Sequence, residues 1–471
     1  MSHSMLKSTP KGAEAPSTGG SNQLHKGLSR AQISMMGLGG AIGAGLFVGS
    51  GQAISIAGPA VLISYLLAGT IVIVIMAMLA EMVAANPSAG AFSTFAHKAM
   101  GRSAGSTVGW LYWIQLVVVI AAEATGAAAI LSAWVPGIPQ WSWVLLFVVV
   151  LTGVNLLGVR NYGKFEFWFA FIKVAAILAF LAFGLLAILG IIPTSQPVGF
   201  ANFVEHGGFA PSGMAGIAAA LLIVIFSFGG TEVVSIAAAE SDDPAGNIKR
   251  TVSQVMLRIL FFYLGSIIVI LAVLPWNSAA VIEGPFSAVL AVLNVPGVEL
   301  MMALLIVVAL LSAMNANIYG ASRMLYSLGH RKMAPTLVTT VTGQGVPANA
   351  VIWSVSFSFI AVGLNWVWPD AVMPLLLNIV GSTIIVIWSF IALTQFILRR
   401  RAQREGTDLP IKLWGFPFLS LATIAAMLGI MAMAMTDATA RTQLLLTLGL
   451  TGVLWLGIKY ALRNRSDIDV R

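Results

Sequence analysis

Long apolar stretches, separated by short polar loops, follow one another along the chain after residue 30. Each is close to the roughly 20 residues that a helix needs to cross a bilayer. We therefore predict twelve membrane-spanning helices. Their approximate ranges are 33–56, 60–85, 106–134, 142–159, 166–190, 213–239, 253–274, 299–327, 348–367, 372–397, 415–435 and 442–461.

The composition supports an all-α integral membrane protein. The 471 residues are 58% hydrophobic and 9% charged, whereas soluble domains are roughly 25% charged. The mean hydropathy is +0.93. There is no cysteine, so disulfides and thiolate metal sites are excluded. Residues 1–30 are rich in Ser, Gly, Pro and Lys and predict a disordered tail.

The positive charges predict the orientation of the chain. The net charge of +8 could suggest a nucleic-acid partner, but the charges gather at the membrane edges, so we expect none. Lys98 and Arg102 follow the second span, and Arg331 and Lys332 follow the eighth, whereas the opposite side shows only Arg441. Lys and Arg favour the cytoplasmic side. We expect both termini to be cytoplasmic, in an inner membrane.

The first span contains a cluster of glycines within Met36–Gly45. Gly39, Gly40, Gly43 and Gly45 lie close together, and each costs about 1 kcal/mol of helix propensity relative to Ala. The cluster predicts a break in the helix. Lipid cannot satisfy the freed backbone groups, so the break should line a polar cavity or hold a polar ligand. The alternative is that the glycines only let neighbouring helices pack closely.

A second apolar span, far along the chain, is interrupted at Phe226–Glu232. Paired discontinuous helices in the two halves of a chain point to the binding site of a transporter. Glu232 follows this interruption, near the N-terminus of the second half-helix, and Glu81 lies near the end of the second span. We interpret both carboxylates as mainly structural or gating residues.

Two charged residues, Lys173 and Glu123, stand out within the predicted spans. A charge at the bilayer centre costs roughly 2.5–3.5 kcal/mol on insertion scales, so such residues usually face the interior and serve function. Lys173 could instead snorkel to the membrane edge, and Glu123 could be a neutral, hydrogen-bonded core carboxyl. The eighth span carries a polar stripe that either joins helices or lines the cavity. Its members are Ser312, Asn315, Tyr319, Ser322 and Tyr326.

Two segments carry a family resemblance. Gly40–Ser50 and Phe226–Glu232 resemble the first-helix and sixth-helix signatures of amino-acid permeases of the amino acid, polyamine and organocation (APC) superfamily, and the likeness covers nearly the whole chain after residue 28. Four further segments resemble bacterial 4-aminobutyrate (GABA) permeases, although carriers for aromatic amino acids, proline and lysine share much of them. These segments are 132–139, 161–168, 236–242 and 321–328.

The resemblance implies a LeuT-like fold, a five-plus-five inverted repeat with discontinuous helices 1 and 6. The repeats would cover 31–190 and 191–398, with two extra helices and a cytoplasmic tail in 399–471. The resemblance also implies that backbone amides of the first break bind the substrate carboxylate and that carbonyls of the sixth-helix break meet the amine. Half-helix dipoles favour the same placement. The implied substrate-binding residues are Ala41, Ile42, Gly43, Ala44, Gly45, Glu123, Phe226, Ser227, Gly229, Thr231 and Asn315, and the proton-coupling residues are Lys173 and Glu123.

The sequence therefore predicts a secondary active transporter that imports a small amino acid together with a proton, by alternating access. GABA or a related ω-amino acid is the expected substrate. The alternatives are a permease for aromatic or other neutral α-amino acids, or an exchanger. A channel, a sensor and a membrane enzyme fit less well, because no soluble domain or catalytic constellation interrupts the spans. We expect protons and lipid as partners and no cofactor, metal or catalytic residue; the oligomeric state stays open.

Overall fold

The computed structural model describes residues 34–35, 38, 40–88, 90–194, 198–239, 244–293, 297–436 and 438–466. Helices joined by turns make up these residues, and no strand occurs among them, as the sequence predicted. The tail expected at residues 1–30 and the glycine at position 39 lie outside the described residues.

The helices lie over the predicted apolar segments, although the helix predicted at 166–190 begins at Val159 and the helix predicted at 253–274 begins at Pro244. Those that carry or surround the interrupted segments are α2 (Ala44–Phe47), α3 (Gly49–Ala57), α4 (Val61–Ala85), α6 (Arg102–Trp134), α7 (Gln140–Leu156), α8 (Val159–Ile188), α9 (Gly213–Ser227), α10 (Val233–Ala239), α11 (Pro244–Val273) and α14 (Val298–His330). The remaining spans correspond to α15 (Ala348–Ser356), α16 (Ser358–Val367), α17 (Pro369–Arg404), α18 (Phe418–Ala434) and α19 (Ala438–Ser466).

The connections contain short helices that the hydrophobic pattern did not predict. They are η1 (Gly58–Ala60), α5 (Ala91–Met100), α12 (Ala279–Glu283), α13 (Pro285–Val292), η2 (Phe200–Phe203) and η3 (Thr336–Thr339). These segments are too short to show a helical periodicity of apolar residues in the sequence. The predicted ninth span is also divided, because the chain turns at Phe357 between α15 and α16.

Eight helical stretches in the described part of the chain are long and apolar enough to cross a membrane. The number is below twelve for two reasons. The first predicted span is interrupted, and its second part continues through Pro59 into the second span, so that Gly49 to Ala85 form one helical stretch. In addition, α7, α9 and α18 are apolar but have only 17, 15 and 17 residues. The multi-pass membrane character is clear, and twelve spans stay a prediction.

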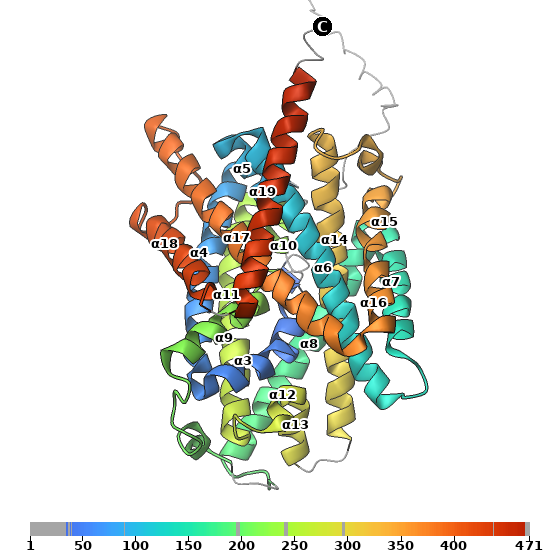
Figure 1. The fold of residues 1–471 in the computed structure, drawn as a ribbon, viewed down its shortest axis with the longest axis vertical. Helices are drawn as coiled ribbons and strands as arrows, with labels where there is room; N and C mark the ends of the chain where they lie inside the picture. The colour runs from blue at the N-terminus through green and yellow to red at the C-terminus, as the bar shows by residue number, and fades with distance from the viewer. Residues whose placement is uncertain are drawn as a thin grey trace, which may run out of the picture.

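The two most buried of these stretches, α6 and α14, pack along each other and form the centre of the bundle, whereas α19 is the least buried. Most long helices run roughly along the long axis of the molecule, with α5 near one end and α12 and α13 near the other (Figure 1). The interrupted segments α2–α3 and α9–α10 lie against this centre, since α2 contacts α6 and α10 contacts α14.

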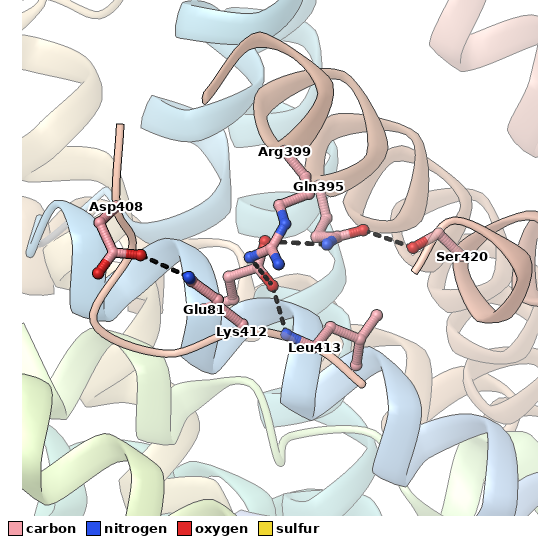
Figure 2. A network of polar contacts seen from close by, with 7 residues as sticks. All are labelled: Glu81, Gln395, Arg399, Asp408, Lys412, Leu413 and Ser420. Carbon is pink, nitrogen blue, oxygen red and sulfur yellow. Dashed lines mark hydrogen bonds and ion pairs between the residues drawn. The ribbon is translucent and has the colours of Figure 1, made fainter. Parts of the chain in front are cut away.

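One buried carboxylate ties α4 to α17 and to the loop that follows α17. Glu81 accepts hydrogen bonds from the Gln395 side-chain amide at 3.0 Å and from the Leu413 backbone N–H at 2.6 Å, and it pairs with Arg399 at 3.3 Å. Ser420 donates to the other end of the Gln395 amide at 2.8 Å. Figure 2 shows these contacts together, with Gln395, Arg399 and Leu413 turned toward Glu81 and Ser420 turned toward the Gln395 amide. The structural role expected for Glu81 therefore has a definite set of partners.

We predict that Glu81→Ala lowers the thermal stability of the purified protein in detergent. The substitution leaves the Leu413 N–H and the Gln395 amide without their acceptor, and a buried donor left in this way costs about 1–3 kcal/mol. Thermal unfolding followed by tryptophan fluorescence measures the change. The matched control is Asp408→Asn in the same loop, which breaks only the exposed pair with Lys412 and should leave the transition unchanged. Equal transitions for Glu81→Ala and the parent protein would contradict this role.

Candidate substrate and coupling site

The first interruption lies within the glycine-rich segment, as predicted. Helical backbone reaches Ala41, the chain bends at Ile42 and Gly43, and α2 begins at Ala44. The bend frees backbone groups near the centre of the protein, where burial makes unpaired N–H and C=O groups costly. The alternative in which these glycines serve only close packing does not account for the bend.

The second interruption is also present, because α9 ends at Ser227 and α10 begins at Val233. The two interruptions touch each other at two points. A Cβ atom placed on Gly40 would lie 2.9 Å from the carbonyl oxygen of Gly230, whose φ of +91° is itself suited to glycine. At the other point, the Ser227 hydroxyl donates to the Gly45 carbonyl at 2.7 Å. Glycine is therefore needed where the two backbones cross.

Side chains from three other helices satisfy the backbone groups of the first interruption. Lys173 of α8 donates to the Ile42 carbonyl at 2.8 Å. The Tyr263 hydroxyl of α11 lies 2.7 Å from the Ala41 carbonyl and 2.6 Å from the Ser227 carbonyl, so it joins both interruptions. The Lys173 ammonium is buried and binds an interior carbonyl, which means that it does not snorkel to the membrane edge.

Glu123 of α6 caps the start of α2. Both of its carboxylate oxygens accept from the Ala44 backbone N–H, at 3.0 and 3.2 Å. A carboxylate at a helix N-terminus is favoured by the free N–H groups and the local dipole. The position in which the resemblance places the substrate carboxylate is therefore occupied by a carboxylate of the protein itself.

The second interruption is capped in a similar way by its own Glu232. This carboxylate accepts from the Gly230 backbone N–H at 3.0 Å and from the indole N–H of Trp388 on α17. The predicted site residue Thr231 lies beside it, fully buried, and its hydroxyl has no hydrogen-bond partner among the described residues. A bound ligand could satisfy this hydroxyl, whereas the Phe226 carbonyl already accepts from the Gly229 N–H at 2.9 Å.

The polar stripe on α14 divides into two groups. Ser312 and Asn315 donate to Glu166 of α8, at 2.9 and 3.1 Å. Further along, the Arg323 guanidinium lies 4.0 Å from the centre of the Tyr319 ring and donates to Ser322 at 3.0 Å. Tyr326 packs edge-on against His330. Ser312 and Asn315 therefore join α14 to α8, so Asn315 is held by protein groups, whereas these contacts of the second group lie within α14 itself.

The sequence did not single out four residues of this region: Asn155, Glu166, Tyr263 and Trp388. Glu166 carried a usable signal, because it lies seven residues before Lys173 and therefore on the same face of one helix. Tyr263 and Trp388 carried none, since their partners are backbone atoms and side chains more than 30 and more than 150 residues away in the chain.

The bundle, with two interrupted helices in contact and charged groups buried around them, defines an integral membrane transport protein. The family model for amino acid permeases matches residues 32–469, and the chain belongs to this family. It is 46% identical over 424 residues to the aromatic amino acid transport protein AroP of Corynebacterium glutamicum, covering 89% of this chain and 91% of that protein. The gamma-aminobutyric acid permeases of Bacillus subtilis and Escherichia coli are 44% and 42% identical, covering 92% and 93% of this chain and 92% and 94% of theirs. The chain is therefore a transporter and not an enzyme.

We predict that Gly43→Val abolishes amino-acid binding. A Cβ atom at this position would lie 2.9 Å from the Ala313 Cβ and 3.0 Å from the Glu123 carboxyl carbon, so the larger side chain would displace both helices from the first interruption. Equilibrium binding to detergent-solubilised protein measures the effect. The control is Gly153→Val on α7, where a Cβ meets nothing within 4 Å. Normal binding by Gly43→Val would show that this backbone is not part of the site.

Proposed function

We propose that the protein imports a small amino acid together with a proton, by alternating access around the two interruptions. The observation that carries the proposal is the ammonium of Lys173 on the Ile42 carbonyl, 2.8 Å away. This contact fixes α8 to the break in the first helix through a positive charge that can be lost and regained. Gain and loss of this proton can therefore make and break a contact between two structural elements.

The proposed binding step is an exchange of carboxylates at the Ala44 N–H. The substrate carboxylate takes the place of Glu123 at the start of α2, and the released Glu123 carboxylate pairs with the substrate ammonium. An ω-amino acid suits this exchange because its two charges are far apart. The hydroxyl of Thr231, which has no hydrogen-bond partner in the part of the chain that the structure describes, supplies a further polar contact from the second interruption. Binding then replaces each lost hydrogen bond, so that no buried group is left unpaired.

The proposed coupling step is the loss of the Lys173 proton toward the cytoplasm. A neutral amine binds the Ile42 carbonyl more weakly than an ammonium does, because charge-assisted hydrogen bonds are the stronger ones. Loss of the proton therefore releases the first interruption from α8 and favours the inward-facing state. One pH unit is worth about 1.4 kcal/mol per proton, and 100 mV adds about 2.3 kcal/mol per charge. A single proton can thus support more than a hundredfold accumulation.

For the substrate, we favour GABA or a related ω-amino acid. The similarity to two proteins named gamma-aminobutyric acid permease supports this choice, and so does the buried Glu123, which offers a carboxylate to a distal ammonium. The second candidate is an aromatic amino acid, favoured by the 46% identity to a protein named for aromatic amino acid transport. Exchange of one amino acid for another is the alternative to import with a proton.

We further propose twelve spans in the inner membrane, with both termini cytoplasmic. The first repeat would cover residues 31–190, the second 191–398, and two additional helices with a tail 399–471. The contact between α2 and α9 supports a fold in which the first and sixth helices are broken at the same depth. The division of positive charges between the two sides supports the orientation.

We predict that Glu123→Gln weakens the binding of GABA more than that of phenylalanine. Loss of one partner from a buried charge pair costs about 2–5 kcal/mol, so GABA affinity should fall at least thirtyfold. The loss should be smaller for phenylalanine, whose ammonium lies next to its carboxylate. Competition binding with both ligands on the same protein measures the difference. Equal losses would leave Glu123 with a structural or proton-transfer role only.

We predict that uptake into proteoliposomes is independent of sodium, collapses with a protonophore, and fails to concentrate substrate in Lys173→Ala. The matched control is Lys173→Arg, which keeps a permanent positive charge on the Ile42 carbonyl but cannot lose a proton. It should bind substrate and exchange it without net accumulation. Sodium-dependent uptake, or accumulation by Lys173→Ala against a gradient, would contradict the proposed coupling.

A further inference from the structure

Glu166 of α8 is a buried carboxylate with no role in the steps above. Its side chain is fully buried, and each of its oxygens accepts from a neutral donor of α14. Ser312 donates its hydroxyl at 2.9 Å to one oxygen, and Asn315 donates its amide at 3.1 Å to the other. Both oxygens therefore face donors, which is the arrangement that an ionised carboxylate needs.

The orientation of the Asn315 amide is fixed from behind. Asn155 of α7 donates to the Asn315 carbonyl oxygen at 2.8 Å and, with the same amide nitrogen, to the Leu151 carbonyl at 2.9 Å. Because its oxygen is engaged in this way, Asn315 presents its NH₂ group to Glu166. Three helices thus contribute to one oriented network that ends on the carboxylate.

A buried anion also needs a positive charge nearby, and the charged groups around Glu166 can be named. Lys173 lies two turns further along α8, on the same face as Glu166. Its ammonium binds the Ile42 carbonyl of the first interruption, where Glu123 binds the Ala44 N–H. Of the other elements packed against α8, α11 contributes the Tyr263 hydroxyl on the first interruption. The sequences of α7 and α13 contain no titratable side chain, and α14 contributes the neutral Ser312 and Asn315. Lys173 is therefore one cation between two carboxylates.

We propose that Glu166 is the fixed counter-ion of Lys173 and that its charge leaves Glu123 free to move. The inference rests on the proposed function, in which Glu123 leaves the Ala44 N–H for the substrate ammonium. Without Glu166, that movement would leave the Lys173 ammonium buried without a negative partner. With Glu166 held by Ser312 and Asn315, Lys173 stays paired throughout the exchange. Glu166 is a positioning residue, since it acts on the substrate only through Lys173.

The test compares the pH profile of GABA uptake in the parent protein, Glu166→Gln and Glu166→Asp. Glutamine keeps the size and removes the negative charge on which Lys173 depends, so the alkaline limb of the profile should move to lower pH, by about one unit. Aspartate keeps the charge and should keep the profile, even if less protein accumulates. The preference for GABA over phenylalanine should be unchanged in both variants, unlike in Glu123→Gln.

Two further variants weaken the donors to Glu166 and keep every charge. Ser312→Ala removes the donor to one carboxylate oxygen, so it should move the alkaline limb to lower pH by a smaller amount than Glu166→Gln does. Asn155→Leu keeps every charge but frees the Asn315 amide to turn, so it should move the alkaline limb in the same direction by a smaller amount. If Glu166→Gln does not accumulate in the membrane, the pH profile of Asn155→Leu tests the proposal instead. An alkaline limb at the same pH as in the parent protein then contradicts the proposal.

The inference is overturned if Glu166→Gln keeps the parent profile, or if Glu166→Asp shifts as far as Glu166→Gln. If uptake by the parent protein responds to a pH gradient, either result contradicts only the role of Glu166. If uptake by the parent protein does not depend on the gradient, the proposed function itself is contradicted.

Discussion

The structure depends on the pairing of backbone groups freed where two helices are interrupted away from water. In hydrocarbon or in a dry core, such groups have no solvent to replace a missing partner. Lys173, Tyr263 and Glu123 supply the partners at the first interruption, and each comes from a different helix. The first interruption is therefore stable only while α6, α8 and α11 keep their places. A change in the hydrogen bonds at this interruption can therefore control the packing of the whole bundle.

This constraint explains why the protein's own carboxylates lie where a ligand is expected. Glu123 occupies the amide at the start of α2, and Glu232 occupies the Gly230 amide of the second interruption. In the absence of a substrate, these positions would otherwise hold unpaired donors. In the proposed cycle, a substrate binds by replacing a protein group of the same chemistry, and the displaced carboxylate becomes a partner for the substrate's ammonium. Ligand binding and helix capping then use the same atoms.

The sequence predicted the parts of this arrangement that local patterns encode. Apolar length located the helices, clustered glycines located the first break, and the rarity of charge in apolar spans singled out Lys173 and Glu123. It did not predict which atoms pair, because Lys173 and Ile42 are 131 residues apart and Tyr263 and Ala41 are 222 apart. Glu166 was missed because it lies at the start of the predicted span, next to the polar residues 160–164, where a carboxylate is common. The division of the α14 stripe was missed because the partner of Ser312 and Asn315, Glu166, lies on another helix more than 140 residues away in the chain.

In the proposed mechanism, a proton accompanies each substrate molecule, and Lys173 carries it. The most direct test is substrate-driven proton movement in sodium-free proteoliposomes that contain a trapped pH indicator, started with equal pH on both sides. We expect external GABA to acidify the interior of vesicles that contain the parent protein, in proportion to the GABA taken up, and to leave the internal pH of vesicles that contain Lys173→Arg unchanged. GABA uptake without acidification, or acidification that persists in Lys173→Arg, would contradict it.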